Sequence, residues 1–388
     1  MPSKNFFSFL PSGSSGRLLL AFLLMISLVP ASISALDLKV LLIRSSPAAE
    51  ISCSTAITLE SPSDHSSITI LSTKPVRITA EQGRISVGQF GVFSSPIRLR
   101  SEQPVRLNGR AYRGSLTVHN RSGILLVVNE VDLEQYLYGV VPREISKTWS
   151  AEVIKAQAVV ARTFALRLRL DGENPLYDLD NSTFSQMYEG ADIEDARVNG
   201  YIDQTSGEVL AYKNVLAQVY YHSTCGGETE SAEDLWGKFV PYLQSVTCRF
   251  CAPSPYFSWT FRLSTRDVEK LLKKKGFDLL PETVRVKRLT ASRRAGVLVF
   301  SGKKASLEMK ANDFRTLAGT KELKSLLFTV RSGPSGFIFE GHGFGHGVGM
   351  CQWGAKGMSD QGMEYLRILQ YYFRGTKVVR APQMAGNR

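Results

Sequence analysis

One apolar segment near the middle of the chain constrains the fold most. Within residues 151–170, apolar side chains recur at positions 154, 158, 161, 165 and 168, which is the spacing of a helix. Val153, Val159 and Phe164 fill other faces, so the predicted helix is apolar nearly all round. Such a helix is stable only where other elements cover it. The sequence therefore predicts a fold built around one central, buried helix.

An isolated acid, Glu144, precedes this helix. Val141 and Ile145 are apolar neighbours on either side of it. Removing a carboxyl group from water raises its pKa, and a group with a raised pKa can serve as a general acid. The alternative is a carboxylate that favours the positive N-terminal end of the helix dipole. These residues alone leave both interpretations open.

Arg162 lies deep within the predicted helix, where a charged side chain requires a partner. One interpretation is a salt bridge inside the domain. The other is that Arg162 orients a carboxylate or the substrate, which makes it a candidate substrate-binding residue. The spacing does not decide between the two.

Short β-branched runs, separated by Ser, Pro and Gly, fill the chain before the predicted helix. Residues 44–104 carry no motif linked to chemistry, so we expect a small β-rich region over residues 36–104. A mixed domain follows over residues 105–380. The expected fold class is therefore α+β, with an N-terminal all-β region, a central buried helix and glycine-rich cleft loops.

The first 35 residues have the composition of an export signal. Lys4 and Arg17 supply positive charge, residues 18–31 are uncharged, and a cleavage region with the small residues Ser32, Ser34 and Ala35 follows. The alternative is an uncleaved N-terminal anchor, but the uncharged run is shorter than the roughly 20 residues that span a membrane. Both interpretations predict an exported protein, in the periplasm or at the outer face of the cytoplasmic membrane or cell wall.

The chain is basic, with a formal net charge of +12. In an exported protein this charge suits an anionic envelope polymer or an anionic membrane surface, whereas export argues against nucleic acid. Membrane attachment is expected only through the N-terminal segment, if it is retained. One local cluster, Lys270, Lys273, Lys274 and Lys275, is expected to be a solvated helix face.

The five cysteines form an odd set, which argues against a simple disulfide framework. His222 and Cys225 are spaced H-x2-C, and Cys248 and Cys251 are spaced C-x2-C. These four residues are predicted to bind a zinc ion, and four protein ligands would make it structural. A disulfide among the cysteines is an alternative, because export permits it. A third is that His222 lines a substrate groove.

Residues 341–349, within the segment FEGHGFGHGVGMCQWGA (residues 339–355), contain too many glycines for a helix or an ordinary strand. We expect a glycine-rich wall whose backbone approaches a ligand. His346 and Gln352 are candidate substrate-binding residues, as is Trp353, whose alternative role is core packing. His342 and His346 are four residues apart, but no Glu lies between them and the glycines disfavour the helix of a metallopeptidase site. Cys351 is expected to be a buried thiol.

Several segments resemble the stage II sporulation protein D (SpoIID/LytB) family. They are VVNEVDLEQYLYGVVPREI, WSAEVIKAQAVVARTFAL, YHSTCGGETESAEDLWG, PYLQSV, GHGFGHGVGMCQWGAKGM and ILQYYFRGT, in the family's order. The resemblance implies that residues 105–380 are a catalytic domain that cleaves peptidoglycan as a lytic transglycosylase. It further implies glycan strands stripped of stem peptides as substrate, a cell-wall amidase as a functional partner, and Glu144 as the catalytic acid. Family members bind zinc near the HSTCGG segment, with ligands that vary between members.

A lytic transglycosylase needs one carboxyl group, whereas hydrolysing glycosidases usually need two. The acid protonates the glycosidic oxygen. The resulting carboxylate then removes the proton of the C6 hydroxyl of the muramic acid, which closes a 1,6-anhydro ring. Two alternatives remain: a peptidoglycan-binding scaffold that cleaves little, and a zinc-dependent amidase or hydrolase that uses His342 and His346.

Overall fold

The computed structural model describes residues 36–172, 174–182 and 185–381. The predicted export signal, residues 1–35, lies outside the described residues. Ala35–Arg388 is one compact unit. Among the described residues, no helix is both long and apolar enough to cross a membrane.

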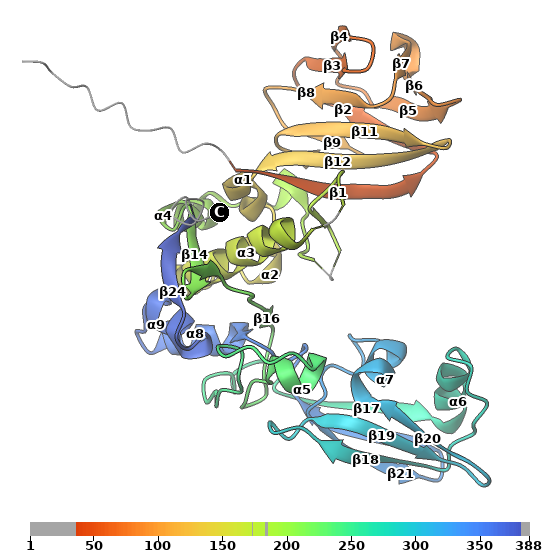
Figure 1. Ribbon diagram of the computed structural model, residues 1–388, viewed down its shortest axis with the longest axis vertical. Coiled ribbons are helices and arrows are strands. Elements are labelled where there is room, and N and C mark those ends of the chain that lie inside the picture. Colours follow the sequence, from red (N-terminus) through yellow and green to blue (C-terminus); the bar gives the residue numbers. More distant parts are fainter. Residues whose placement is uncertain (1–35, 173, 183–184, 382–388) are drawn as a thin grey trace, which may run out of the picture. The chain divides into compact units, whose positions relative to one another are not determined.

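Two β-sheets form the N-terminal part of the molecule (Figure 1). One has the strand order β13-β1-β12-β11-β8-β3-β4, and the other β10-β9-β2-β5-β6-β7. The strands are β1 (Asp37–Ser46), β2 (Ala48–Ser52), β3 (Ile57–Ser61), β4 (Ser66–Ile70), β5 (Val76–Glu81), β6 (Arg84–Val87), β7 (Val92–Ser94), β8 (Ile97–Arg100), β9 (Val105–Leu107), β10 (Arg110–Tyr112), β11 (Ser115–Arg121), β12 (Ile124–Asp132) and β13 (Leu179–Asp180). A short 3-10 helix, η1 (Gly88–Phe90), joins β6 to β7.

Strand pairing runs across residue 104, where the sequence placed the start of the second domain. β11 pairs with β8, β12 pairs with β1, and β9 pairs with β2. The strands after residue 104 therefore complete the sheets begun by those before it. The reason lies in burial: in β12, Leu125 and Val127 join the main core, while Leu126 and Val128 pack with Leu41 on the other face.

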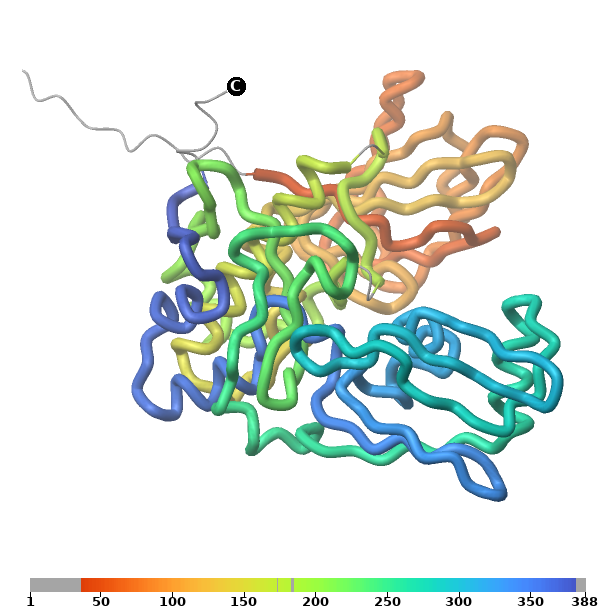
Figure 2. The backbone as a smooth tube through the Cα atoms, turned by 60° about the horizontal axis from the view of Figure 1, so that its bottom comes forward, coloured from red at the N-terminus to blue at the C-terminus, as the bar shows by residue number. Residues whose placement is uncertain are grey.

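The predicted central helix is α3 (Ala151–Asp171). Twelve of its residues are buried, from Val153 to Leu166. It packs against β14 (Glu208–Tyr212) and against the helices α1 (Leu133–Tyr138), α4 (Ala196–Gln204), α8 (Gln352–Asp360) and α9 (Tyr365–Tyr372) (Figures 1 and 2). The α+β class with a β-rich N-terminal region is thereby confirmed.

Short elements link α3 to the glycine-rich segment. β15 (Val215–Leu216), β14 and β24 (Lys377–Arg380) form a three-stranded sheet, and β16 (Tyr221–His222) pairs in parallel with β23 (Met350–Cys351). The remaining elements of this part are α2 (Val141–Glu144), η2 (Gly190–Ile193) and α5 (Ala232–Trp236).

Residues 258–342 form a module with its own hydrophobic core. It contains two three-stranded sheets, β17-β22-β21 and β18-β19-β20. Its elements are β17 (Ser258–Ser264), α6 (Thr265–Lys273), β18 (Thr283–Leu289), β19 (Ala295–Ser301), β20 (Ser306–Lys310), α7 (Ala311–Ala318), β21 (Phe328–Gly333) and β22 (Gly336–His342). The N–H of Gly343 donates to the carbonyl of Phe257 at 3.1 Å, so the module begins and ends at the same place.

Candidate active site around Glu144

Glu144 is the last residue of α2, a single helical turn. Pro142 lies in its first turn, where the missing N–H is not needed. Buried side chains on either side, Val141 and Ile145, anchor the turn in the core. Residues 145–150 separate Glu144 from α3, whose first turn carries Glu152 instead. Glu144 is therefore not at the start of α3, where the helix-dipole interpretation requires it to be.

The carboxyl group of Glu144 is half-buried. Burial raises its pKa above the ordinary value. Hydrogen bonds from the N–H of Met187 and from the side chains of Tyr221 and Gln352 act in the opposite direction but do not cancel the effect of burial. The N–H of Met187 lies 3.4 Å from Oε1. Glu144 thus has both a raised pKa and donors for its ionised form.

A chain of hydrogen bonds orients the hydroxyl of Tyr221. The hydroxyl of Tyr136 donates to Oε1 of Gln186 at 3.1 Å, and Nε2 of Gln186 lies 3.1 Å from the hydroxyl oxygen of Tyr221. An amide nitrogen can only donate, so the oxygen of Tyr221 accepts this bond. Its own proton is left to donate to Glu144.

The sequence did not point to Tyr221 or Gln186 as functional residues. Tyr221 directly precedes the H-x2-C pair and opens the segment YHSTCGGETESAEDLWG, but neither pattern gave it a role. Gln186 lies in a polar loop that has no motif, and its role depends entirely on tertiary contacts.

The structure brings Gln352 to Glu144, as expected for a residue of the same site. Gln352 begins α8, and its Nε2 donates to Oε1 of Gln157 on α3 at 3.3 Å. Trp353 follows it, half-buried, with its ring centroid 5.2 Å from that of Trp149 in an edge-on arrangement. Trp149 belongs to the loop after Glu144 and Trp353 follows Gln352, so the two rings meet where these two segments of the chain come together.

His346 supports the site from within. Its Nδ1 accepts from the N–H of Val348 at 3.1 Å, which places the ring proton on Nε2, and Nε2 donates to the carbonyl of Tyr221 at 3.0 Å. Burial lowers the pKa of His346 to about 4, so the ring is neutral at pH 7. Both nitrogens are used inside the protein, which leaves none for substrate or metal. The predicted substrate contact of His346 is replaced by a contact that holds Tyr221.

The glycines of residues 341–349 have a different role from the one expected. A Cβ atom on Gly349 would lie 2.1 Å from the carbonyl oxygen of Tyr220, and one on Gly343 would lie 2.5 Å from that of Thr224. Both glycines also have positive φ angles. At these two positions the segment approaches the backbone of residues 220–225 as closely as glycine permits.

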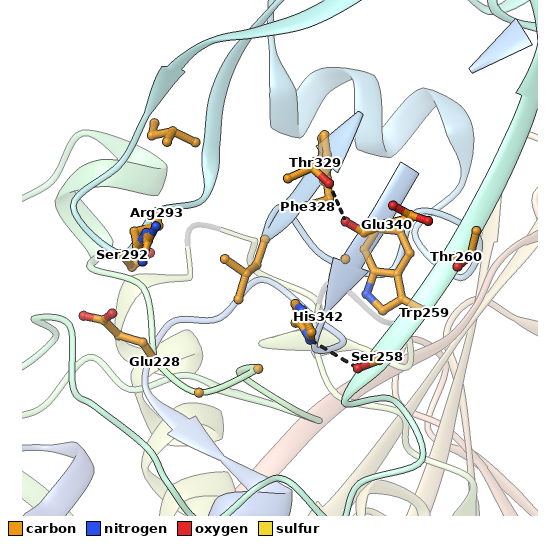
Figure 3. A pocket seen from close by; sticks show the side chains of 15 residues that line it. Glu228, Ser258, Trp259, Thr260, Ser292, Arg293, Phe328, Thr329, Glu340 and His342 are labelled. Carbon is orange, nitrogen blue, oxygen red and sulfur yellow. Dashed lines mark hydrogen bonds between the residues drawn. The ribbon is translucent and has the colours of Figure 1, made fainter. Parts of the chain in front are cut away.

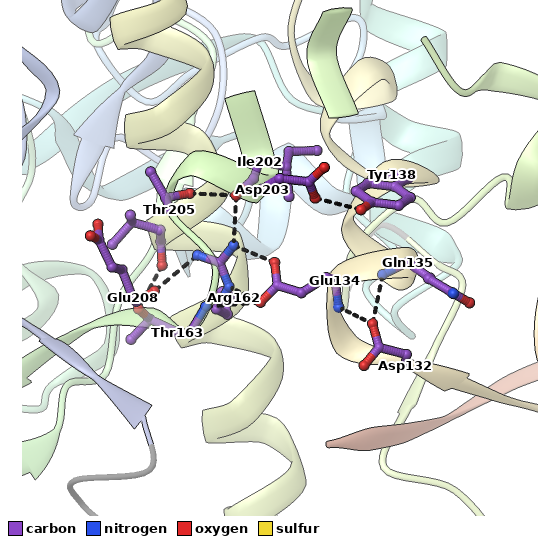
Figure 4. A network of polar contacts seen from close by, with 12 residues as sticks. Asp132, Glu134, Gln135, Tyr138, Arg162, Thr163, Ile202, Asp203, Thr205 and Glu208 are labelled. Atoms are coloured by element: carbon purple, nitrogen blue, oxygen red, sulfur yellow. Dashed lines mark hydrogen bonds and ion pairs between the residues drawn. The ribbon is translucent and has the colours of Figure 1, made fainter. Parts of the chain in front are cut away.

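Arg162 is part of the core (Figure 4). Its side chain is 0% exposed and makes a bidentate salt bridge with Glu134, at 2.8 Å and 2.6 Å. It also donates to the carbonyl of Glu208 at 2.9 Å. A side chain with no exposed surface cannot contact a glycan, so the substrate-binding interpretation is wrong and the salt bridge inside the domain is correct.

A cluster of four buried thiols lies near β16 and β23. Cys225, Cys248, Cys251 and Cys351 place their sulfur atoms within 4.8 Å of one another. The sulfurs of Cys225 and Cys251 are 3.5 Å apart, well beyond a disulfide bond of about 2.0 Å. Tetrahedral zinc with Zn–S distances of about 2.3 Å sets sulfurs about 3.8 Å apart. The donor set and its spacing therefore fit zinc.

His222 is not part of this cluster, although the sequence included it. Its Nδ1 lies 3.1 Å from the carbonyl oxygen of Val348. Cys351 takes the fourth position instead, and its sulfur accepts from the backbone N–H groups of Cys225 and Gly354, each at 3.2 Å. Sequence spacing favoured His222 as a zinc ligand because it is close to Cys225 in the chain. Cys351 is distant in sequence and reaches the cluster through the pairing of β16 with β23.

A separate groove of about 1080 Å³ lies against the module (Figure 3). Its lining comes from residues 226–228 and 258–342, including Glu228, Ser258, Trp259 and His342. His342 is exposed there, with Nδ1 3.1 Å from the carbonyl oxygen of Phe257. Among the residues that the structure describes, His342 and His346 belong to no group of three or more metal-binding side chains. The geometry of a zinc hydrolase site is thus lacking in this part of the chain.

Comparison with known proteins identifies the family. The model of the SpoIID family, described as stage II sporulation protein, matches residues 121–212. Stage II sporulation protein D of Bacillus subtilis is 30% identical over 269 residues, which are 66% of this chain and 76% of that protein. The chain belongs to the stage II sporulation protein D family.

Other relatives extend the match. A protein of Brachyspira hyodysenteriae without an assigned function is 35% identical over 320 residues, 80% of this chain and 84% of that one. The amidase enhancer of Bacillus subtilis is 27% identical over 354 residues, 76% of this chain and 48% of the enhancer. A model described as a domain of unknown function (DUF8618) matches residues 231–349, a range that contains the module.

Membership in the SpoIID family indicates a cell-wall-related function. The similarity to an amidase enhancer points in the same direction. The family and its location at the cell wall are compatible with an exported protein.

Proposed function

We propose that the protein is a peptidoglycan lytic transglycosylase in which Glu144 is the general acid and base. It cleaves the bond between N-acetylmuramic acid and N-acetylglucosamine in glycan strands, with peptide-stripped strands as the preferred substrate. The observation that carries the proposal is the setting of Glu144. It is a half-buried carboxyl group with a raised pKa, beside Tyr221 and Gln352.

The setting of Glu144 suits a reaction in which one group first donates and then accepts a proton. In the resting protein, burial keeps the carboxyl protonated to a higher pH than usual, so it can protonate the glycosidic oxygen. Once it has given up this proton, the carboxylate accepts hydrogen bonds from Met187, Tyr221 and Gln352. The stabilised carboxylate then removes the proton of the C6 hydroxyl. That oxygen bonds to the anomeric carbon as the bond from this carbon to the protonated glycosidic oxygen breaks. The 1,6-anhydro ring closes, and the N-acetylglucosamine leaves with a free hydroxyl.

The decisive experiment is mass spectrometry of the soluble products from denuded and from intact peptidoglycan. The wild-type protein is expected to release 1,6-anhydro ends, and Glu144→Gln should release them at least about 100-fold more slowly, the usual contribution of a general acid. Glu364→Gln, an exposed carboxyl at the residue before α9, is the matched control and should retain full activity. Reducing ends from the wild type, or unchanged anhydro products from Glu144→Gln, would contradict the proposal.

Loss of folding cannot explain inactivity if Glu144→Gln is more stable than the wild type. A carboxyl with a raised folded-state pKa is protonated in both states below about pH 4. Above that pH the unfolded chain ionises first, so the native state loses relative stability as pH rises. Thermal unfolding at pH 7 should therefore show a higher Tm for Glu144→Gln, and the difference should close near pH 4.

A second candidate is a peptidoglycan-binding scaffold that assists a cell-wall amidase. The similarity to an amidase enhancer favours it. It predicts binding to sacculi with no soluble product from either substrate, together with faster release of stem peptides when an amidase is added. Stimulation of an amidase by Glu144→Gln as strong as by the wild type would support this candidate.

We further propose that Cys225, Cys248, Cys251 and Cys351 hold a structural zinc ion. Four thiolates complete a tetrahedral shell and leave no position for a reacting water. Zinc would tie β23 and the start of α8 to the segment after β16, and thereby hold Gln352 near Tyr221. Its contribution is to stability, and the chemistry belongs to Glu144.

A further inference from the structure

The net positive charge of the chain is concentrated in the module. Residues 258–342 contain 18 Lys and Arg and 8 Asp and Glu, a net charge of +10 out of +12 for the whole chain. The rest of the protein is nearly neutral. The charge therefore belongs to one structural unit that takes no part in the Glu144 site.

One end of this module combines free lysines with exposed apolar side chains. We call this set the lysine tip: Lys274, Lys275, Phe277, Leu280, Lys303 and Lys304. Its four lysines are exposed and have no ion pair within the described chain. Phe277 is 40% exposed and Leu280 54% exposed.

The fold brings the two lysine pairs to the same end. Lys274 and Lys275 follow the last turn of α6, and the N–H of Phe277 closes that turn on the carbonyl of Leu272 at 3.1 Å. The backbone then runs against the β19–β20 turn. A Cβ atom on Gly302 would lie 2.5 Å from the carbonyl oxygen of Leu280. Lys303 and Lys304 come directly after Gly302, so the turn that carries them lies against Leu280, in the segment that follows Lys274 and Lys275.

The nearby acids do not cancel this charge. Asp278 shares Lys273 with Glu269, at 3.2 Å and 3.0 Å, so its charge is only partly balanced. Glu282 is the other acid of this segment. The four unpaired lysines of the tip therefore outnumber these two carboxylates.

We propose that the lysine tip docks the protein on an anionic phospholipid surface. Lysines attract acidic headgroups, and Phe277 and Leu280 can enter the boundary between headgroups and acyl chains. A soluble polyanion would use the lysines but gain nothing from exposed Phe and Leu, which is why a membrane fits better. The outer face of the cytoplasmic membrane is the surface that an exported protein meets. The proposal is independent of the reaction at Glu144.

The test is co-sedimentation of residues 35–388, one compact unit, with vesicles of phosphatidylglycerol and phosphatidylcholine. Binding is expected to these vesicles and not to phosphatidylcholine alone. Reversing either pair, Lys274→Glu with Lys275→Glu or Lys303→Glu with Lys304→Glu, should weaken partitioning at least about 25-fold, since one basic residue near an acidic surface contributes about fivefold. Phe277→Ser with Leu280→Ser should weaken it about tenfold.

The matched control is Lys74→Glu with Lys238→Glu, which changes the net charge equally at exposed lysines outside the module. It should bind vesicles nearly as well as the wild type. Equal loss in this control would overturn the proposal, because general charge would then explain binding. So would undiminished binding by the Phe277→Ser, Leu280→Ser variant together with tight binding of soluble polyphosphate, which would indicate an anionic polymer as partner.

Discussion

At the scale of single residues, burial and hydrogen bonding have opposite effects on the pKa of Glu144. Burial raises the pKa of the carboxyl, while three donors stabilise its ionised form. Tyr221 is the donor whose direction is fixed by other residues, through Gln186 and Tyr136. We therefore regard Tyr221 as a positioning residue that sets the proton affinity of Glu144.

Tyr221→Phe should shift the pH profile of glycan cleavage. The hydroxyl of Tyr221 lowers the pKa of Glu144, so its loss raises that pKa further. Because the reaction begins from protonated Glu144, the alkaline limb of kcat/KM should move to higher pH. The maximum rate should fall about tenfold or more, since the carboxylate formed by proton donation loses a donor.

The control is Tyr256→Phe, whose ring is exposed and lies outside the site. It should leave both the rate and the pH profile unchanged. A slower Tyr221→Phe with an unshifted alkaline limb would mean that Tyr221 only supports the fold.

The sequence predicted Glu144 and its surroundings better than it predicted its partners. Val140, Val141 and Ile145 are adjacent in sequence, so the desolvation of Glu144 is a local property. Tyr221 and Gln352 reach it from segments 77 and 208 residues away, and nothing in their immediate sequence fixes that distance. Arg162 was ambiguous for the same reason, because Glu134 completes its pair from another helix.

At the scale of elements, the pairing of β16 with β23 determines which side chains form the cysteine cluster. His222 stands opposite Cys351 in this parallel pair. The sulfur of Cys351 joins the other thiols, while the ring of His222 turns to the carbonyl of Val348. Two residues at the same register thus have different surroundings.

This difference can be tested by metal content. Cys351→Ser should lose bound zinc, measured by elemental analysis of the purified protein, and its Tm should fall by several degrees. His222→Ala should retain one zinc per chain, because His222 is outside the cluster. Removing the metal from the wild type with a chelator should lower Tm as Cys351→Ser does.

Zinc loss from His222→Ala with retention in Cys351→Ser would restore the ligand set expected from sequence. Absence of zinc from the wild type would contradict the metal proposal as a whole.

At the scale of the whole molecule, one buried arginine connects the module to the rest. Arg294 is 1% exposed and donates from Nη2 to the carbonyls of Cys225 and Glu228, both at 2.7 Å. The hydroxyl of Thr290 adds a bond to Glu230 at 2.7 Å. The module is therefore attached by side chains as well as by its two ends.

Arg294→Met should loosen this attachment. Removal of the guanidinium leaves the buried carbonyl of Cys225 and the partly buried carbonyl of Glu228 without this donor. An unsatisfied buried carbonyl costs about 1–3 kcal/mol. We expect the free energy of unfolding to fall by about 3 kcal/mol in chemical denaturation. Arg293→Met, the exposed neighbour, is the control and should change stability by less than about 0.5 kcal/mol.

The concentration of positive charge in the module could not be predicted from the sequence. Counting gives +12 for the chain, and the lysine cluster on α6 is visible in the sequence. Without the limits of the module, however, the count does not show that the charge is concentrated in one part of the chain. Only the folded module shows that Lys303 and Lys304 share an end with Lys274 and Lys275.

The module also imposes an order on the assembly of the protein. Cys225, Cys248 and Cys251 precede it in the chain, whereas Cys351 follows it. The chain is synthesised from its N-terminus, so the first three thiols are made before the fourth. Another 99 residues separate Cys251 from Cys351. In an oxidising compartment, the three early thiols can form disulfides with one another during this interval. Such disulfides would prevent them from joining Cys351 in the cluster. Residues 258–342 must therefore fold into a unit that returns the chain to its starting point before Cys351 can join the other three thiols.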